Sequence, residues 1–373
     1  MSQTLEPAPV ESLRVAAFTV PTDAPESDGT IRWEDTTLVA VEARAGGEVG
    51  LGYTYGHRAA VALIAQKLGP LVLGRPVTGA PEGVWQAMVD AVRNLGRPGL
   101  AAHAISAVDA ALWDLTARSL DVPLVDLLGR AHDRLPVYGS GGFTSYDDGR
   151  LTDQLASWTA AGIDRVKMKT GRDPADDPRR VALARRAVGD DVALFVDANG
   201  ALDVASARLA CRWLTDLGVT WFEEPVSSDD LPGMRRVRDA APGLAITAGE
   251  YGYDLWTFRR MLAAEAVDVI QADATRCLGI TGFRKVAILA EAFHVPLSTH
   301  TAPGLHLHPA CAARPAVHLE YFHDHVRIER TLFDGLPALE DGCLAPDRTR
   351  PGHGLRLRWA DAEAHRVAEE TIR

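Results

Sequence analysis

From residue 135 onward, short apolar runs alternate regularly with amphipathic helical segments. Strand–helix alternation of this kind is typical of a parallel sheet. The runs that we interpret as strands are PVYGS, DRVKMK, VALFVDAN, VTWFEEP, LAITAGE, VDVIQAD, VPLSTH and VHLEYF. Eight strands within roughly 190 residues match a closed (β/α)₈ barrel, whereas a doubly wound sheet would not need eight. The sequence therefore predicts an α/β protein built on a modified TIM barrel.

The first part of the chain has a different pattern. Residues 12–52 form short alternating runs, which indicates an antiparallel meander. A helix is expected over residues 104–120, because apolar side chains recur there at helical spacing. The last residues are expected to return to this α+β domain, with a possible strand at 355–359. The expected units are therefore 1–130, 131–345 and 346–373.

Ionisable residues appear where the predicted barrel strands end. Measured from Lys169, successive strand ends are 28, 26, 27, 23, 27 and 20 residues apart, about one strand–helix unit each. In a barrel the C-terminal strand ends meet at one mouth, where active sites lie. We therefore expect these side chains to share one volume. They are Lys167, Lys169, Asp197, Glu223, Glu250, Asp273, His300 and Glu320.

Three of these residues are carboxylates on adjacent strands: Asp197, Glu223 and Glu250. Side by side, three anions repel one another unless a cation is present. An all-oxygen ligand set suits Mg²⁺. The alternative is that one or two are surface carboxylates or helix N-caps, the role that we expect for Glu224. Three acids at the ends of successive strands, each about one strand–helix unit from the next, favour the metal site.

Lys167 and Lys169 lie two positions apart on one predicted strand, so both point to one face while Met168 points to the other. Two ammonium groups beside a metal are expected to lower one another's pKa, which makes a lysine a base near neutral pH. The alternative is an exposed edge strand with solvated lysines. The apolar neighbours Ile163 and Val166 favour a buried barrel strand.

Asp273 and His300 end consecutive strands. A carboxylate bonded to one imidazole nitrogen fixes the tautomer and makes the other nitrogen a stronger base. The chain has 12 histidines, and a single histidine is more often structural. We interpret the pairs His306/His308 and His323/His325 as structural or peripheral, because no carboxylate lies in phase with them.

The composition limits the class of partner. Asp and Glu total 50 against 39 Lys and Arg, a formal net charge of −11, which argues against nucleic acid or an anionic membrane. The four cysteines are scattered, as in reduced cytosolic proteins. The chain shows no signal peptide and no apolar stretch long enough to span a membrane. We expect a soluble, cytoplasmic protein that acts on a small molecule.

These groups together suit removal of a proton from the carbon beside a carboxylate. A positioned base supplies only about 3–5 kcal/mol of the required 8–23 kcal/mol. A metal on the carboxylate oxygens, with Lys167 or Glu320 adding charge or a hydrogen bond, would stabilise the enolate. A hydrolytic metal barrel would need more histidine ligands. A non-catalytic sensor would need no opposed lysine and histidine.

The chain resembles the enolase superfamily, and within it the mandelate racemase subgroup, over essentially its whole length. The resemblance is carried by an ordered set of motifs. They are KMK at 167–169, VDAN at 196–199, WFEEP at 221–225, GE at 249–250, Asp273, STH at 298–300, HLE at 318–320 and the helix segment AISAVDAALWDLTARSLDVPLVDLLG.

The resemblance implies a capping domain over the barrel and one Mg²⁺ per subunit, bound by the three carboxylates Asp197, Glu223 and Glu250. It implies that Lys169 is the base on one face of the substrate and that His300, oriented by Asp273, is the acid or base on the other. Lys167 would contact the substrate carboxylate. Glu320 would support the enolate from the far side. A homo-oligomer is also expected.

In this subgroup, specificity is attributed to two capping-domain loops, here at about 19–33 and 52–58. The second contains Tyr53, Tyr55 and His57, which would either hydrogen-bond sugar hydroxyls or pack over the mouth. Asn199 is a further candidate for substrate contact. The polar loops favour dehydration of a sugar acid. Racemisation or epimerisation of a 2-hydroxy acid by the Lys169/His300 pair stays an alternative.

Overall fold

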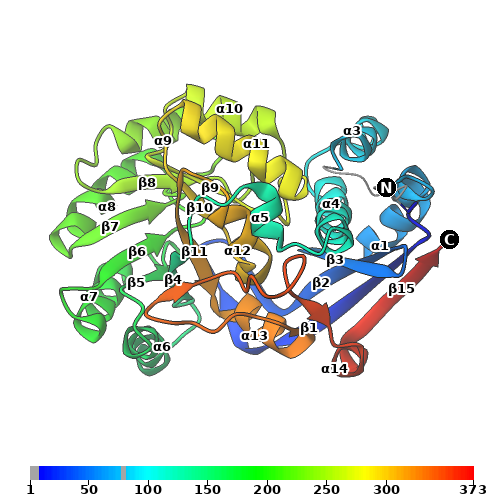
Figure 1. Ribbon diagram of the computed structural model, residues 1–373. Helices are drawn as coiled ribbons and strands as arrows, with labels where there is room; N and C mark the ends of the chain where they lie inside the picture. The colour runs from blue at the N-terminus through cyan, green and yellow to red at the C-terminus, as the bar shows by residue number, and fades with distance from the viewer. Residues whose placement is uncertain (1–7, 77–80) are drawn as a thin grey trace.

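The computed structural model describes residues 8–76 and 81–373, which form a barrel with a second, mainly antiparallel domain packed against it (Figure 1). The barrel has eight parallel strands, and β11 pairs with β4 to close it. The predicted TIM-type barrel with a capping domain is thereby confirmed. The barrel strands are β4 (Leu135–Gly141), β5 (Arg165–Lys169), β6 (Ala193–Asp197), β7 (Val219–Glu223), β8 (Ala245–Ala248), β9 (Val269–Ala272), β10 (Leu297–Thr299) and β11 (Ala316–Phe322).

A helix follows each barrel strand and packs on the outside (Figure 1). Four of the helices begin at an aspartate N-cap, whose carboxylate accepts a hydrogen bond from a backbone N–H of the first turn; the caps are Asp147, Asp203, Asp230 and Asp254. The helices are α6 (Asp148–Ala160), α7 (Asp177–Val188), α8 (Val204–Asp216), α9 (Leu231–Arg238), α10 (Leu255–Ala263), α11 (Gly279–Ala292), α12 (Pro303–Cys311) and α13 (His323–Leu332).

The capping domain is a four-stranded sheet in the order β15-β1-β2-β3, covered by helices. The long helix α4 lies directly against β3. Gly50 and Gly52 allow this approach, because a Cβ there would lie 2.3 and 2.2 Å from the carbonyl oxygens of Ala111 and Ala107. The elements are β1 (Ser12–Ser27), β2 (Arg32–Ala45), β3 (Glu48–Tyr55), α1 (Ala59–Leu63), the π-helix η1 (Ile64–Leu68), α2 (Gly69–Val72), α3 (Glu82–Ala91), α4 (Leu100–Ser119) and α5 (Leu124–Leu128).

The C-terminal segment differs from the expectation. The predicted strand at 355–359 is reduced to β14 (Arg356–Leu357), which pairs with β12 (Phe333–Asp334). The strand that joins the capping sheet is β15 (Arg366–Ile372), antiparallel to β1. The sequence pattern did not predict this strand, because three of the seven residues in RVAEETI are charged and none of its side chains is fully buried. The other elements here are β13 (Cys343–Leu344), α14 (Trp359–Ala362) and the 3₁₀ turn η2 (Glu363–His365).

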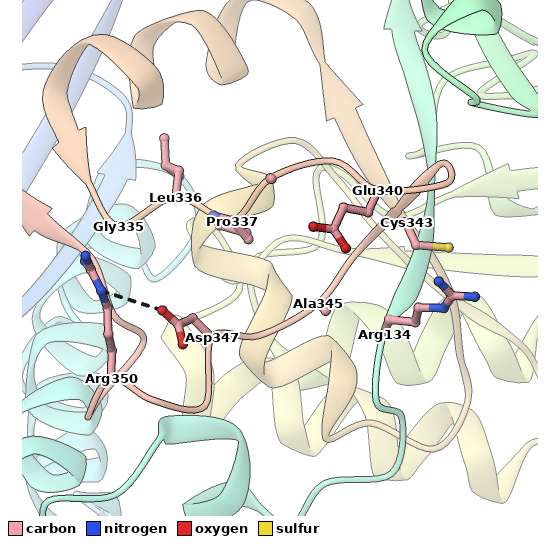
Figure 2. A pocket seen from close by; sticks show the side chains of 10 residues that line it. Arg134, Gly335, Leu336, Pro337, Glu340, Cys343, Ala345, Asp347 and Arg350 are labelled. Atoms are coloured by element: carbon pink, nitrogen blue, oxygen red, sulfur yellow. Dashed lines mark ion pairs between the residues drawn. The ribbon is translucent and has the colours of Figure 1, made fainter.

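Residues 335–350 include β13, which pairs with the first residues of β4. They border a pocket that also involves Arg134, which directly precedes β4, and an ion pair joins Arg350 to Asp347 across 3.6 Å (Figure 2). None of the predicted site residues lines this pocket. In the described part of the chain, no helix is both long and apolar enough to cross a membrane.

Candidate active site

Three carboxylates meet at the C-terminal end of the barrel. Asp197 ends β6, Glu223 ends β7, and Glu250 follows β8 by two residues. One ligand atom from each lies within 4.8 Å of the others, and all three residues are buried. The parallel register explains this, because Asp197 pairs with Glu223 across β6 and β7. The structure thus brings together the three acids that the sequence placed in phase.

The donor atoms of this trio fit a hard divalent cation. All are carboxylate oxygens, the set that Mg²⁺ prefers. Glu223 Oε1 is buried without a hydrogen-bond partner among the described residues. Burial and the neighbouring Glu223 raise the pKa of Asp197 to about 7. An orphaned oxygen and crowded like charges are the features that a bound cation would relieve.

Both predicted lysines enter the same volume from β5. Lys167 Nζ donates to Glu223 Oε2 at 2.6 Å and lies 2.9 Å from Glu320 Oε1. Lys169 Nζ donates to Asp197 Oδ2 at 2.5 Å. The two ammonium groups therefore already neutralise part of the carboxylate charge, and they lie on the β5 side of the trio.

The expected lowering of the lysine pKa values concerned lysines beside a bound metal, and the carboxylates that contact the two lysines act in the opposite direction. Burial lowers the pKa of both lysines, but the carboxylates outweigh it and raise the pKa of Lys167 and of Lys169 above the usual range. Lys167 does lower the pKa of Lys169, as anticipated, yet Asp197 has the larger opposing effect. The expectation rested on the neighbouring ammonium and a metal, and direct contact with the carboxylates adds a third influence on the pKa of each lysine.

On the opposite side of the trio, Asp273 and His300 form a hydrogen-bonded pair. Asp273 follows β9 and His300 follows β10, and His300 Nδ1 lies 2.8 Å from Asp273 Oδ2. His300 Nε2 lies 3.3 Å from Glu250 Oε2. Burial disfavours the imidazolium, but Glu250 and Asp273 raise the pKa of His300 to about 9. The Asp273 contact at Nδ1 directs Nε2 toward the carboxylate trio.

Glu320 lies on β11, between the lysines and the histidine. Its Oε1 accepts from Ser140 Oγ at 2.6 Å, and its Oε2 accepts from the backbone N–H of Thr301 at 2.7 Å. Burial raises its pKa, but Lys167 and His300 lower it to about 2. Glu320 is therefore an ionised, fully hydrogen-bonded carboxylate at the far wall of the site.

Aromatic side chains close the barrel beneath the charged groups. Tyr138, Phe195 and Trp221 form one buried cluster inside the barrel. Lys167 Nζ lies 5.2 Å from the centroid of the Tyr138 ring, and Trp221 Nε1 donates to Glu223 Oε2 at 3.1 Å. This floor keeps water away from below, so the electrostatic interactions above it act at low dielectric.

Glu224 lies in surroundings that differ from the expected ones. The sequence predicts a surface or helix-capping carboxylate, but Glu224 is buried and its Oε1 has no partner among the described residues. Burial and then Glu250 raise its pKa well above the usual range. The cause is a left-handed backbone, with φ of 36°, which interrupts the strand alternation after Glu223. Asn199 and Thr301, which follow β6 and β10 by two residues, also have positive φ values, of 47° and 49°.

The four candidate substrate residues occupy different surroundings. The Tyr53 hydroxyl is fully buried and donates to Glu329 Oε1 at 2.6 Å, so Tyr53 adopts the packing alternative. Tyr55 stacks on His325, with centroids 3.4 Å apart. His57 is exposed, and its Nδ1 accepts from the backbone N–H of Ala59. Asn199 lies beside the trio, where its backbone N–H donates to Asp197 Oδ1.

The predicted loop at 19–33 is a β-hairpin tip, since β1 runs to Ser27 and β2 begins at Arg32. The tip lies against the barrel mouth: Arg172 donates to the carbonyl oxygens of Asp28 and Ile31, and a Cβ on Gly29 would lie 2.4 Å from Ala198 O. The hairpin tip is therefore held at the strand ends that carry Lys169 and Asp197.

Two further residues lie near the site: Arg276, which the sequence pattern did not single out, and His325, which was expected to be structural or peripheral. Arg276 Nη1 donates to the Glu250 carbonyl oxygen at 3.1 Å, and its Nε lies 3.6 Å from Asp273 Oδ2. His325 Nδ1 accepts from the backbone N–H of Ala302 at 3.3 Å. Both lie a few residues beyond a strand end, so strand periodicity alone could not identify them.

Sequence models of two related domains match this chain. The mandelate racemase/muconate lactonizing enzyme N-terminal domain matches residues 14–129, and the enolase C-terminal domain-like model matches residues 150–362. The chain belongs to the mandelate racemase/muconate lactonizing enzyme family. The resemblance seen in the sequence motifs is thereby confirmed.

Relatives of this mandelate racemase family member cover almost the whole chain. It is 35% identical over 357 residues to the 3,6-anhydro-alpha-L-galactonate cycloisomerase of Streptomyces coelicolor, which covers 93% of this chain and 97% of the relative. It is 31% identical over 360 residues to the L-talarate/galactarate dehydratase of Salmonella typhimurium, covering 93% and 88%.

Solved structures of family members agree with the fold. A mandelate racemase/muconate lactonizing enzyme-like protein from Rubrobacter xylanophilus superposes with a TM-score of 0.94 at 50% identity, over 96% of this chain and 100% of that one. A variant of an L-talarate/galactarate dehydratase, solved with Mg and L-glucarate, superposes with a TM-score of 0.90 at 26% identity, over 100% of this chain and 95% of that one.

Proposed function

We propose that this protein is a magnesium-dependent acid-sugar dehydratase, which removes the proton α to a carboxylate and expels the β-hydroxyl. The observation that carries this proposal is the placement of Lys169 and His300 on opposite sides of one buried carboxylate trio. A substrate carbon above the trio would meet a proton-transfer group on each face. The Salmonella relative, named as a dehydratase of sugar diacids, supports the same reaction.

Asp197, Glu223 and Glu250 would hold one Mg²⁺, as their all-oxygen donor set and the unpaired Glu223 Oε1 suggest. When bound, the ion supplies positive charge that polarises the substrate carboxylate and offsets the charge that accumulates on its oxygens. Lys167, which bridges Glu223 and Glu320, would donate to the same carboxylate from below. Once the trio is neutralised, Lys169 loses the interaction that holds its pKa high.

The proton transfers follow from the side-chain positions. Lys169 Nζ takes the α-proton, and the C–H electron pair moves into the substrate carboxylate to form an enediolate. That pair then returns to form the Cα–Cβ double bond as the C–O bond to the β-hydroxyl breaks. His300, held through Nδ1 by Asp273, delivers the proton that lets the hydroxyl leave as water. The enol product becomes a 3-deoxy-2-keto acid by tautomerisation.

Racemisation or epimerisation is the second candidate, since opposed proton-transfer groups also suit it. In that reaction one group of the Lys169/His300 pair removes the α-proton and the other returns a proton to the opposite face. The two reactions give different products, because only dehydration loses the β-hydroxyl.

The test is a substrate screen of hexarates, hexonates and pentonates with the Mg²⁺-loaded protein, with 2-keto acid formation as the readout. At least one member is expected to yield a 3-deoxy-2-keto acid, and EDTA is expected to stop the reaction. Inversion at the α-carbon without loss of the hydroxyl would replace this proposal with the epimerase alternative. Turnover that is unaffected by EDTA would contradict the metal assignment.

A further inference from the structure

A second group of metal-ligating side chains lies outside the catalytic mouth, between the capping hairpin and the barrel. It consists of Asp23 and Glu26 on β1 and His323, the first residue of α13. One ligand atom from each lies within 4.8 Å of the others, the same spacing as in the catalytic trio. In the part of the chain that the structure describes, these are the two groups that reach this spacing.

Glu26 provides an observation that is independent of the clustering. Its side chain is 0% exposed, its Oε2 accepts from Trp33 Nε1 at 2.7 Å, and its Oε1 has no hydrogen-bond partner among residues 8–76 and 81–373. A buried polar oxygen without a partner is unfavourable, because it loses its hydrogen bonds to water and gains none in return. This oxygen requires a ligand that the described residues do not supply.

The nearby arginines do not neutralise Glu26. Arg150 pairs with Asp23 Oδ1 at 2.9 Å, and Arg327 pairs with Asp324 Oδ1 at 2.5 Å. Glu26 forms no ion pair among the described residues, and burial together with the charge of Asp324 raises its pKa to about 8. The surroundings therefore hold one buried acid that has no ion-pair partner among the described residues.

Asp23 and His323 complete the donor set at the rim. His323 Nε2 lies 3.1 Å from Asp23 Oδ2, and both side chains are partly exposed, at 24% and 39%. The cluster is thus open to solvent on one side and closed at Glu26 on the other. An ion could enter from the rim and reach the unpaired oxygen.

We propose that Asp23, Glu26 and His323 bind a second divalent ion, which belongs to the borderline d-block metals such as Zn²⁺ or Co²⁺. The imidazole nitrogen separates this site from the all-oxygen catalytic trio, because imidazole suits Zn²⁺ and its neighbours, whereas Mg²⁺ prefers oxygen. Two carboxylates and one neutral histidine would bind the ion with zero or small net charge. Water would fill its remaining positions.

The site lies between two structural elements that a bound ion would hold together. Asp23 and Glu26 belong to the hairpin whose tip lies on the barrel mouth, whereas His323 follows β11 by one residue and Glu320 by three. An ion held by both elements would join the capping hairpin to the wall of the active site. The proposal is independent of the proposed dehydration, because it concerns a separate set of ligands.

The test counts Zn²⁺ bound per chain by equilibrium dialysis of the full-length protein, since Zn²⁺ would also enter the catalytic trio. The wild type is expected to bind two equivalents. His323→Asn and Asp23→Asn, both at partly exposed positions, are each expected to bind one. His294→Asn is the matched control and is expected to bind two, because His294 is exposed on the far end of α11 and asparagine tolerates its left-handed backbone.

A visible spectrum with Co²⁺ provides the second readout. The band intensity that depends on nitrogen ligation is expected to be lost in His323→Asn and kept in His294→Asn. Equal stoichiometry and equal spectra in the wild type and His323→Asn would overturn the second site. If instead Glu223→Gln binds as many ions as the wild type, the catalytic metal assignment fails while the His323 result stands.

Discussion

The carboxylic acids of the catalytic mouth and those at the cap–barrel contact are both buried. Their surroundings nevertheless shift their pKa values in opposite directions. In the mouth, His300 and Lys167 outweigh burial and lower the pKa of Glu320 to about 2. At the cap–barrel contact, burial raises the pKa of Asp109 and of Glu329 to about 7. Their hydrogen-bond donors there are neutral: Thr281 for Asp109, and Tyr53 with the Gly304 N–H for Glu329.

The difference separates two uses of a buried carboxylate. A carboxylate that faces lysine or imidazolium stays charged and can act on a substrate or a metal. A carboxylate that faces only neutral donors is a structural acceptor that joins two domains. Asp197 and Glu224 are exceptions within the mouth, because burial and then neighbouring carboxylates raise their pKa values.

Glu223→Gln tests the mouth and is expected to have the largest effect. The change removes one charged oxygen donor of the trio while it keeps the side-chain size. Turnover at saturating substrate is expected to fall by about 10²–10³-fold, with a higher Mg²⁺ requirement. Asp216→Asn, at the exposed end of α8, is the matched control and should keep wild-type values. If the Mg²⁺ dependence of Glu223→Gln were unchanged, the role of Glu223 as a charged metal ligand of the mouth would be contradicted.

Asp109→Asn tests the cap–barrel contact. The pKa of Asp109 is raised in the folded protein from 3.8 to about 7, so its contribution to stability is fully present below about pH 4 and is lost as the pH rises through about 7. Between about pH 5 and pH 8 the wild type is therefore expected to lose up to about 3 kcal/mol through this group.

Urea unfolding at both pH values measures this loss. The asparagine variant is expected to lack that component, because its amide does not titrate. The same pH dependence in both proteins would show that Asp109 is already charged in the folded state, like the acids of the mouth.

Asp273→Asn tests how much catalysis depends on the orientation of the His300 ring. The amide cannot hold the His300 ring as the carboxylate does at 2.8 Å, so kcat is expected to fall about ten- to hundredfold. Metal content should stay at the wild-type level, because Asp273 is not one of the trio. Loss of the bound metal instead would show that Asp273 supports the trio and not the histidine.

Tyr53→Phe is expected to have the smallest effect. It removes the donor to buried Glu329 and should lower the free energy of unfolding by about 1–2 kcal/mol. Its kcat and KM should stay within about twofold of the wild type, since an interaction of this size in the mouth would cost about tenfold. A large rise in KM with unchanged stability would indicate that Tyr53 contacts the substrate.

The two regions also differ in how far the sequence predicts them. In the mouth, each ionisable residue follows an apolar strand, so a repeat of one strand–helix unit was enough to group Lys169, Asp197 and His300. At the cap–barrel contact no such repeat exists. His323 lies 300 residues from Asp23 in the chain, so the sequence pattern could not indicate that its Nε2 contacts this carboxylate.

Local backbone geometry accounts for the remaining differences. Glu224 was misplaced because a positive φ follows the strand end, and strand alternation cannot anticipate that turn. β15 was missed because its side chains remain largely exposed, so it lacks the apolar alternation that identifies a strand. The positions of Arg276 and His325 depend on the turns after β9 and β11, which the sequence pattern does not encode.

Hydrogen exchange at the substrate α-carbon in deuterated water tests the central claim most directly. With Mg²⁺ present, the wild type is expected to exchange the α-hydrogen of its substrate, while Lys169→Ala and His300→Asn lose net turnover and retain at most exchange on one face. That outcome would place a proton-transfer group on each side of the carboxylate trio. Normal turnover and exchange in both variants would contradict the account.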